Sequence, residues 1–215
     1  MLIDTAGMRK RGKIDESVER YSVVRALNSI ERADVCVIML DACEGVTEQD
    51  TKIAGYVHDQ GKAAVFAVNK WDLVAKETNT MKNFKDRLLE GFNFMMYADS
   101  IFISAKTGQR VEDLFEMLDS AVEENRKRIS TGLLNDVIND AIAMVQPPSD
   151  KGKRLKIYYG TQASVKPPTF VLFVNNAELA HYSYVRYLEN KIRDAFGFRG
   201  TPIKFIIREK GEKAQ

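Results

Sequence analysis

Residues 63–72 have the sequence AAVFAVNKWD, and this stretch decides the fold that we expect for the chain. The run 63–68 is short and apolar without alternation, which is typical of a strand buried on both faces of a parallel sheet. Polar side chains begin directly after it, at Asn69. Because ligands bind at the carboxyl ends of strands in open α/β sheets, Asn69, Lys70 and Asp72 are candidates for a binding site.

Two more stretches repeat this arrangement of an apolar run before a polar residue. They cover residues 35–41 and 100–104. Helical hydrophobic patterns separate the runs; Thr47 followed by Asp50 is typical of a helix N-cap, and Gly61 of a helix end. The expected helices cover residues 18–30, 47–60, 81–92 and 111–128. This alternation predicts an open α/β sheet with flanking helices.

The pattern changes after Arg128. Apolar residues at helical spacing lead to Pro147 and Pro148, which end the helix, and two strand-like runs, a helix and a last strand follow. The expected elements are a helix at 133–145, strands at 155–160 and 169–174, a helix at 184–196 and a strand at 202–207. The order α-β-β-α-β predicts a small α+β domain, so we expect two domains, residues 1–130 and 131–215.

Composition limits the class of protein. A hydrophobic fraction of 45% and a charged fraction of 29% are ordinary for a globular protein with a core. No apolar run approaches the roughly 20 residues of a membrane-spanning helix, and the start lacks the pattern of a secretion signal. Cys36 and Cys43 lack the spacing of a metal site, so we expect buried free thiols in a reducing compartment. These features predict a cytoplasmic protein.

Charge is unevenly distributed along the chain. Residues 1–132 carry 19 Lys and Arg against 22 Asp and Glu, whereas residues 133–215 carry 13 against 8. A basic C-terminal part favours a polyanionic partner, although a solvated surface explains the same excess.

Residues 1–15 have the sequence MLIDTAGMRKRGKID and allow two interpretations. Gly7 to Lys13 match the start of the P-loop motif G-x-x-x-x-G-K-[ST], whereas residues 4–7 match the D-x-x-G motif that senses a γ-phosphate. A P-loop requires a hydroxyl after its Lys to bind Mg²⁺, but Ile14 follows Lys13. Residues 4–7 are therefore predicted to be the phosphate sensor, and no other P-loop motif occurs in the 215 residues.

Three predicted strand ends thus carry polar motifs, namely D-T-A-G at 4–7, N-K-W-D at 69–72 and S-A-K at 104–106. Guanine presents two donors, N1–H and the exocyclic amine, on one edge of its ring. A fixed carboxylate such as Asp72 accepts both, whereas adenine lacks this donor pair and leaves the carboxylate unsatisfied. Together the three motifs resemble those of the Ras-like, translation-factor-related GTPases.

The resemblance implies a role for several motif residues. Asn69 would tie neighbouring loops together, the aliphatic stem of Lys70 would lie along the base, and the Ala105 N–H would donate to guanine O6. Asp4 would reach Mg²⁺ through water, and the Gly7 N–H would bond the γ-phosphate. The implied GTP-binding residues are Asp4, Thr5, Ala6, Gly7, Asn69, Lys70, Asp72, Ser104, Ala105 and Lys106.

A narrower resemblance covers essentially the whole chain. DTAGMRKRGKIDESVERYSVVRALNSIERADV, with NKWDLV, SAKTG and YLENKIRDAFGFRGTPIKFIIR, is similar to the Der (EngA) family of bacterial proteins. This resemblance implies that residues 1–130 are the C-terminal part of the second of two tandem GTPase domains, and that residues 131–215 are a KH-like domain. It also implies GTP hydrolysis during assembly of the large ribosomal subunit, with its rRNA as partner.

We expect the 215-residue chain alone to hydrolyse GTP negligibly, because the P-loop and first switch of that domain are not in it, and we assign no catalytic residue. Met8 replaces the water-orienting Gln of Ras-like enzymes, and a thioether cannot orient water. By resemblance, K⁺ would assist hydrolysis in the complete protein; alternatively, Met8 only packs against the switch.

The alternative function for the chain is a non-catalytic RNA- or ribosome-binding module with a vestigial nucleotide site. An open sheet edge also predicts self-association.

The C-terminal domain offers two candidate RNA contacts. Residues 197–200, GFRG, match the KH motif G-x-x-G but precede the last strand, so we expect a structural turn there. RNA contact is expected from the basic surface instead. Its residues are Lys151, Lys153, Arg154, Lys156, Lys166, Arg186, Lys191 and Arg193. Tyrosines in the same domain are expected to pack against the sheet or, alternatively, to stack on bases. They are Tyr158, Tyr159, Tyr182 and Tyr184.

Overall fold

The structure is a computed structural model that describes residues 26–150 and 152–211. It divides into two compact units, Met1–Val122 and Glu123–Gln215, each of which is described by itself. The D-T-A-G motif at 4–7 and Met8 lie outside the described residues.

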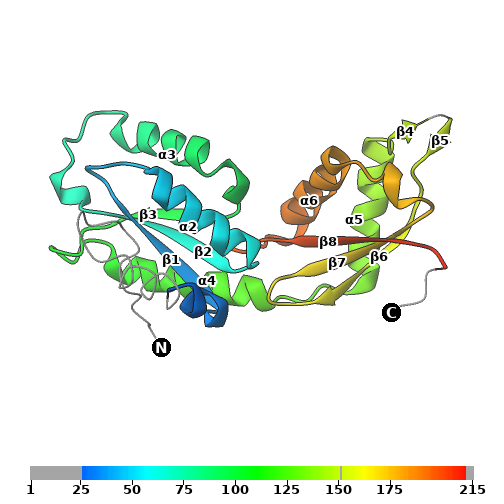
Figure 1. Ribbon diagram of the computed structural model, residues 1–215, viewed down its shortest axis with the longest axis horizontal. Helices are drawn as coiled ribbons and strands as arrows, with labels where there is room; N and C mark the ends of the chain where they lie inside the picture. Colours follow the sequence, from blue (N-terminus) through cyan, green and yellow to red (C-terminus); the bar gives the residue numbers. More distant parts are fainter. Residues whose placement is uncertain (1–25, 151, 212–215) are drawn as a thin grey trace, which may run out of the picture. The chain divides into compact units, whose positions relative to one another are not determined.

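The first unit contains a parallel sheet in the order β1-β2-β3 (Figure 1). These strands are β1 (Val35–Asp41), β2 (Ala63–Asn69) and β3 (Asp99–Phe102). Residues 63–68 of β2 are all buried, as their unbroken apolar sequence predicts. In the register between β1 and β2, Asp41 pairs with Asn69, so the polar ends of these strands lie side by side.

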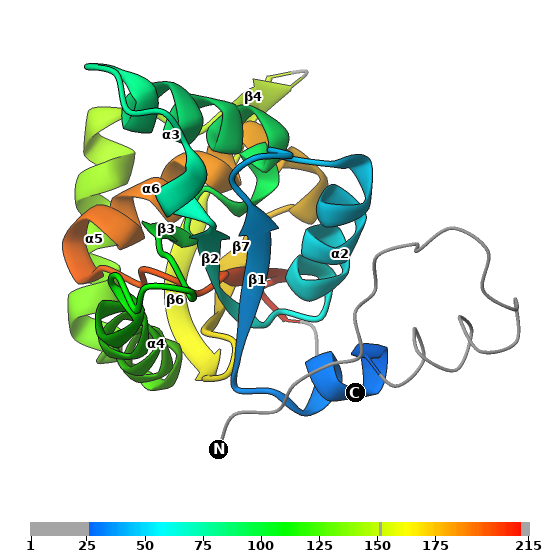
Figure 2. The same ribbon diagram turned by 90° about the vertical axis from the view of Figure 1, so that its left-hand side faces the viewer.

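Helices cover both faces of this sheet, as Figure 2 shows. α2 (Glu48–Asp59) and α3 (Thr80–Gly91) pack against the face formed by Ile38, Phe66 and Phe102. α4 (Val111–Arg126) packs against the opposite face through Leu114 and Ala121. Short 3₁₀ helices are η1 (Trp71–Leu73) and η2 (Asn93–Met95), and residues 26–32 are also helical. The predicted open α/β arrangement is confirmed.

The start and end of α2 follow the expected local signals. The Thr47 hydroxyl accepts a hydrogen bond from the Asp50 N–H at 3.2 Å, and the Asp50 carboxylate accepts one from the Thr47 N–H at 3.0 Å. This reciprocal capping box satisfies donors that the first helical turn leaves unpaired. Gly61 follows the helix with a φ of +68°, a conformation that other residues adopt at a cost.

The second unit has the predicted order α-β-β-α-β (Figure 1). Its main elements are α5 (Thr131–Met144), β6 (Ile157–Ser164), β7 (Thr169–Val174), α6 (Tyr182–Phe196) and β8 (Lys204–Glu209), with a 3₁₀ helix η3 (Ala177–Leu179). β7 pairs antiparallel with β6 and parallel with β8. β6 begins two residues later than the predicted strand 155–160 and continues to Ser164, because its pairing with β7 runs from Ile157 to Ser164. A small antiparallel pair that the sequence did not predict precedes it, β4 (Ser149–Asp150) with β5 (Lys153–Arg154).

The core of the second unit lies between this sheet and the helices α5 and α6. Buried Leu134, Ile138, Leu172 and Leu188 belong to it. Gly160 of β6 faces α5 so closely that a Cβ atom there would lie 2.6 Å from the Ile138 Cδ1 atom. A side chain at this position would therefore require the Ile138 side chain to move.

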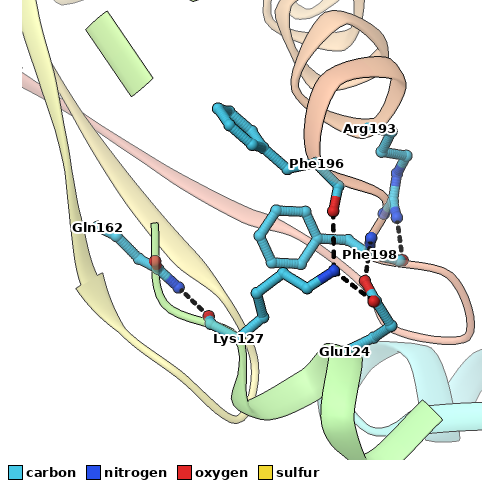
Figure 3. A network of polar contacts seen from close by, with 6 residues as sticks. All are labelled: Glu124, Lys127, Gln162, Arg193, Phe196 and Phe198. Carbon is cyan, nitrogen blue, oxygen red and sulfur yellow. Dashed lines mark hydrogen bonds and ion pairs between the residues drawn. The ribbon is translucent and has the colours of Figure 1, made fainter. Parts of the chain in front are cut away.

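The GFRG segment is a turn, as predicted. Gly197 and Gly200 have φ values of +91° and +70°, and Phe198 between them is fully buried. Figure 3 shows how the turn is held. The Phe198 N–H donates to the Glu124 carboxylate at 2.5 Å, and the Lys127 ammonium donates to that carboxylate and to the Phe196 carbonyl. The last turn of α4 and the residues after it thus belong structurally to the second unit.

Two expectations from composition meet different outcomes. Among the described helices, none combines the length and apolar character needed to cross a membrane. Cys36 is a buried free thiol, as expected, but Cys43 is exposed. The expectation for Cys43 was wrong because β1 ends at Asp41, so Cys43 lies in the loop beyond the sheet.

Candidate functional site

The site begins at the carboxyl end of β2, where the backbone reverses direction. Lys70 adopts a left-handed conformation with φ +61° and ψ +29°, and η1 starts at Trp71. Such a conformation is uncommon for a residue with a side chain, and it ends the strand sharply. Asn69 and Asp72 are half-buried, whereas Lys70 is exposed.

Asn69 connects this turn to the loop after β3. Its side-chain oxygen accepts a hydrogen bond from the Ala105 N–H at 2.9 Å. Backbone bonds reinforce the connection: the Trp71 N–H donates to the Ile103 carbonyl at 3.1 Å, and the Ile103 N–H donates to the Val68 carbonyl at 2.8 Å. The N-K-W-D and S-A-K motifs therefore form one continuous edge.

Asp72 presents a carboxylate at this edge. A hydrogen bond from the side chain of Ser104 is the main cause that holds the pKa of Asp72 below its usual value, with smaller contributions from Lys106 and Lys76. Ser104 is fully buried. The lowered pKa keeps the half-buried Asp72 carboxylate ionised at neutral pH.

The S-A-K loop is a tight turn that leaves its tip exposed. The Ser104 N–H donates to the Gln109 carbonyl at 3.1 Å, and the Ser104 hydroxyl accepts from the Thr107 N–H at 3.2 Å. Ala105 and Lys106 are exposed beside the turn of β2. The structure therefore brings together six of the predicted site residues: Asn69, Lys70, Asp72, Ser104, Ala105 and Lys106. Asp4, Thr5, Ala6 and Gly7 lie outside the described residues.

Two contributors to the site were not predicted from the sequence. Trp71, at the variable position of N-K-x-D, is buried and its ring lies 4.4 Å from that of Phe102 and 5.8 Å from that of Phe84. Asp41 forms an ion pair with the Lys70 ammonium at 2.5 Å. Asp41 carries a detectable signal, because it is the polar residue that ends the strand next to β2.

The edge offers a carboxylate, an ammonium, a backbone N–H and a side-chain amide within one turn-and-loop unit. A carboxylate can accept two parallel donors, which is the pattern that guanine presents. In residues 26–150 and 152–211, no group of three or more His, Cys, Asp or Glu is arranged to hold a metal ion. The predicted Mg²⁺ contact, Asp4, lies outside these ranges.

In the second unit, the predicted basic residues lie in different environments. Lys153, Arg154, Lys156, Lys166 and Arg186 are exposed. Arg193 is half-buried; it pairs with Glu189 at 2.8 Å and donates to the Phe198 carbonyl at 2.7 Å. Lys191 lies over the Tyr187 ring, and Lys151 is outside the described residues. Of the four tyrosines, Tyr184 is buried and Tyr158, Tyr159 and Tyr182 are exposed.

Comparison with known proteins finds matches to both units of the chain. Residues 21–124 match the model of the elongation factor Tu GTP-binding domain, and residues 128–208 match the KH-domain-like C-terminal domain of EngA bacterial GTPase enzymes. The GTPase Der of Acetivibrio thermocellus is 62% identical over 98% of this chain and 48% of its own length. The GTPase Der of Agathobacter rectalis is 57% identical over 99% of this chain and 48% of its own length.

A solved structure of Era in complex with MgGDPNP and nucleotides 1506–1542 of 16S ribosomal RNA is 16% identical in sequence, with a TM-score of 0.46. The match covers 92% of this chain and 73% of the Era chain. The chain spans about half the length of the curated relatives that it matches. The matches to those relatives extend through both units, and the match to the EngA C-terminal model is specific to the second. Over nearly its whole length, the chain is therefore a member of the Der (EngA) family of GTPases.

Proposed function

We propose that the first unit recognises the guanine base of GTP and GDP, as part of a cytoplasmic GTPase that acts in assembly of the large ribosomal subunit. The observation that carries the proposal is the hydrogen bond from the Ala105 N–H to the Asn69 side-chain oxygen, which joins the turn that bears the half-buried Asp72 carboxylate to the S-A-K loop. Asp72 would accept guanine N1–H and the exocyclic amine, and guanine O6 would share the Ala105 N–H with Asn69. Adenine would place its N1 acceptor against the carboxylate, which is repulsive.

The hydrolytic part of the proposal concerns residues beyond the described edge. In the complete protein, Mg²⁺ at the phosphates would neutralise developing charge; we propose that Asp4 reaches this ion through water and that the Gly7 N–H donates to the γ-phosphate. The residues of the edge, Asn69, Asp72 and Ala105, hold guanine and exclude adenine. Hydrolysis is measured on the protein made from its complete reading frame, where a P-loop motif followed by a Thr-bearing switch is expected upstream. A reading frame without that motif would favour a non-catalytic module instead.

Base recognition is tested by substituting Asp72. Asp72→Asn should lose affinity for GMP and gain affinity for XMP, because an amide N–H can donate to the C2 carbonyl that xanthine has in place of the guanine amine. The matched control is Asp86→Asn in α3, which removes the same charge from an exposed position outside the edge. Both variants of the 215-residue chain are titrated with millimolar GMP, XMP and AMP by NMR. An unchanged base preference in Asp72→Asn would contradict the proposal.

We also propose that the exposed cations of the second unit contact rRNA. Lys153, Arg154 and Lys156 lie close together in sequence and are exposed. A basic side chain that pairs with a phosphate displaces counterions from the RNA, so its removal should make the affinity less dependent on salt concentration. Replacing these three residues with Gln should therefore weaken rRNA binding and reduce the slope of log K against log salt by up to about 2 to 3. A control that replaces Lys82 and Lys85 of α3, in the other unit, should leave the slope unchanged.

A further inference from the structure

Asp41 is a buried carboxylate at the edge that carries the N-K-W-D motif. It ends β1 and is only 7% exposed. Its two oxygens have different partners: Oδ1 accepts from the Cys43 N–H at 2.9 Å, and Oδ2 pairs with the Lys70 ammonium at 2.5 Å. An ionised carboxylate at this depth requires such partners, because burial removes the water that would otherwise solvate its charge.

The backbone fixes the other end of this interaction. Asp41 is in register with Asn69, and the Ala42 N–H donates to the Asn69 carbonyl at 2.9 Å. The residue before Lys70 is thus bonded to the segment that follows Asp41. The left-handed conformation of Lys70 then sets the direction in which its side chain leaves the strand.

A lysine stem left to itself samples many rotamers, and binding of a ligand would have to order them. The side chain of Lys70 is 53% exposed, so packing alone does not immobilise it. The ion pair with Asp41 restricts the Lys70 side chain instead, because the Asp41 carboxylate is nearly buried and each of its oxygens has a partner. The hydrogen bond to Asp41 is also the main cause that raises the pKa of Lys70.

We propose that Asp41 is a positioning residue of the guanine site, which holds the Lys70 ammonium so that the methylene stem is already ordered when the base arrives. This inference rests on the proposed function. It makes the loop after β1 a third component of the site, beside the turn after β2 and the loop after β3. Because Asp41 acts through a stem that packs on the base plane, it contributes to affinity and leaves the choice between bases to Asp72.

The ion pair is tested first without nucleotide, by pulse acetylation of lysines in the 215-residue chain followed by mass spectrometry. Lys70 should react more slowly than exposed Lys76 in the wild-type protein. Asp41→Asn should raise the reactivity of Lys70 several-fold and leave Lys76 unchanged, and Asp41→Glu should restore part of the protection. The control Asp59→Asn, an exposed position at the end of α2, should change neither lysine. Equal Lys70 reactivity in wild type and Asp41→Asn would overturn the proposal.

The second test measures GMP affinity. Asp41→Asn should weaken GMP binding by about tenfold, equivalent to about 1.4 kcal/mol, without changing the preference for GMP over AMP and XMP. In Lys70→Met, the same Asp41 substitution should have no further effect, because its target is gone. Full additivity of the two substitutions would overturn the proposal even if each one weakens binding. Failure of the wild-type chain to distinguish GMP from AMP would contradict the proposed function alone, since the acetylation test uses no nucleotide.

Discussion

The side-chain oxygen of Asn69 and the backbone N–H of Ala105 form a hydrogen bond of 2.9 Å that joins positions 36 residues apart. It connects the turn after β2 to the loop after β3, and these two segments carry every described residue that we propose to contact guanine directly. The relative position of the Asp72 carboxylate and the Ala105 N–H therefore depends on this bond.

Removal of that connection should weaken nucleotide binding. Asn69→Ala leaves the Ala105 N–H without its acceptor, and we expect a loss of GMP affinity of about tenfold to a hundredfold. The measurement is an NMR titration of the 215-residue chain. Asn79→Ala is the matched control, because Asn79 is exposed and its side chain caps no helix. Equal affinities in the two variants would show that the bond does not organise the site.

Trp71 should anchor the turn through its packing. Trp71→Ala removes a ring buried against Phe84 and Phe102, and we expect the free energy of unfolding of the first unit to fall by about 3–5 kcal/mol. Leu73→Ala, in the same 3₁₀ helix but 62% exposed, should change it by less than about 1 kcal/mol. Urea unfolding followed by circular dichroism measures both. Similar losses would mean that the burial of Trp71 does not stabilise the turn.

Gly160 should tolerate no side chain. Gly160→Ala introduces a Cβ 2.6 Å from Ile138 Cδ1 and 3.1 Å from Leu172 Cδ2, and we expect a loss of about 1–3 kcal/mol in the second unit. Gly132→Ala in α5 meets no atom within 4 Å and should stabilise the helix by up to about 1 kcal/mol. Hydrogen exchange of α5 and β6 amides reports both effects. The two substitutions should change the stability of the second unit in opposite directions. A Gly160→Ala variant as stable as the wild type would contradict this expectation.

The last turn of α4 should stabilise the second unit. The Glu124 carboxylate accepts from the Phe198 N–H, and the Gln162 side chain accepts from the Ile129 N–H at 2.7 Å. Glu124→Ala leaves the Phe198 N–H unpaired, so we expect a loss of about 1–3 kcal/mol. Glu116→Ala, exposed on the same helix, should have little effect. A fragment 123–215 should likewise melt at a higher temperature than 131–215, and equal melting temperatures would argue against a role for residues 123–130.

The two thiols should differ in reactivity and pH dependence. Burial raises the pKa of Cys36 to about 11, whereas Cys43 is exposed. At pH 8 a disulfide reagent should therefore modify Cys43 quickly and Cys36 only after unfolding. Because the folded state holds the Cys36 proton more tightly, its contribution to stability is complete below about pH 9 and is lost as the pH rises to about 11. Cys36→Ala should remove that alkaline dependence; its persistence would contradict the assignment.

The sequence predicted the elements well where local chemistry decides them. Residues 63–68 are apolar throughout because both faces of β2 are covered, and Thr47 with Asp50 forms the N-cap because both groups lie in one turn. The order of elements in the second unit followed from hydrophobic periodicity for the same reason.

Contacts between distant positions were not predictable in this way. The pairing of Lys70 with Asp41 depends on strand register, and the pairing of Glu124 with Phe198 joins positions 74 residues apart. The sequence does not indicate the burial of Trp71, because its position in N-K-x-D accepts any residue; packing against Phe84 of α3 and Phe102 of β3 buries it.

The measurement that tests the central claim most directly is a titration of the ¹⁵N-labelled 215-residue chain with millimolar GMP and AMP, followed at the Ala105 amide and the Asn69 side-chain amide. If the edge recognises guanine, GMP should shift both signals in a saturable way, and AMP should shift neither. Equal shifts with the two nucleotides, or no shift with GMP, would contradict guanine recognition by this site.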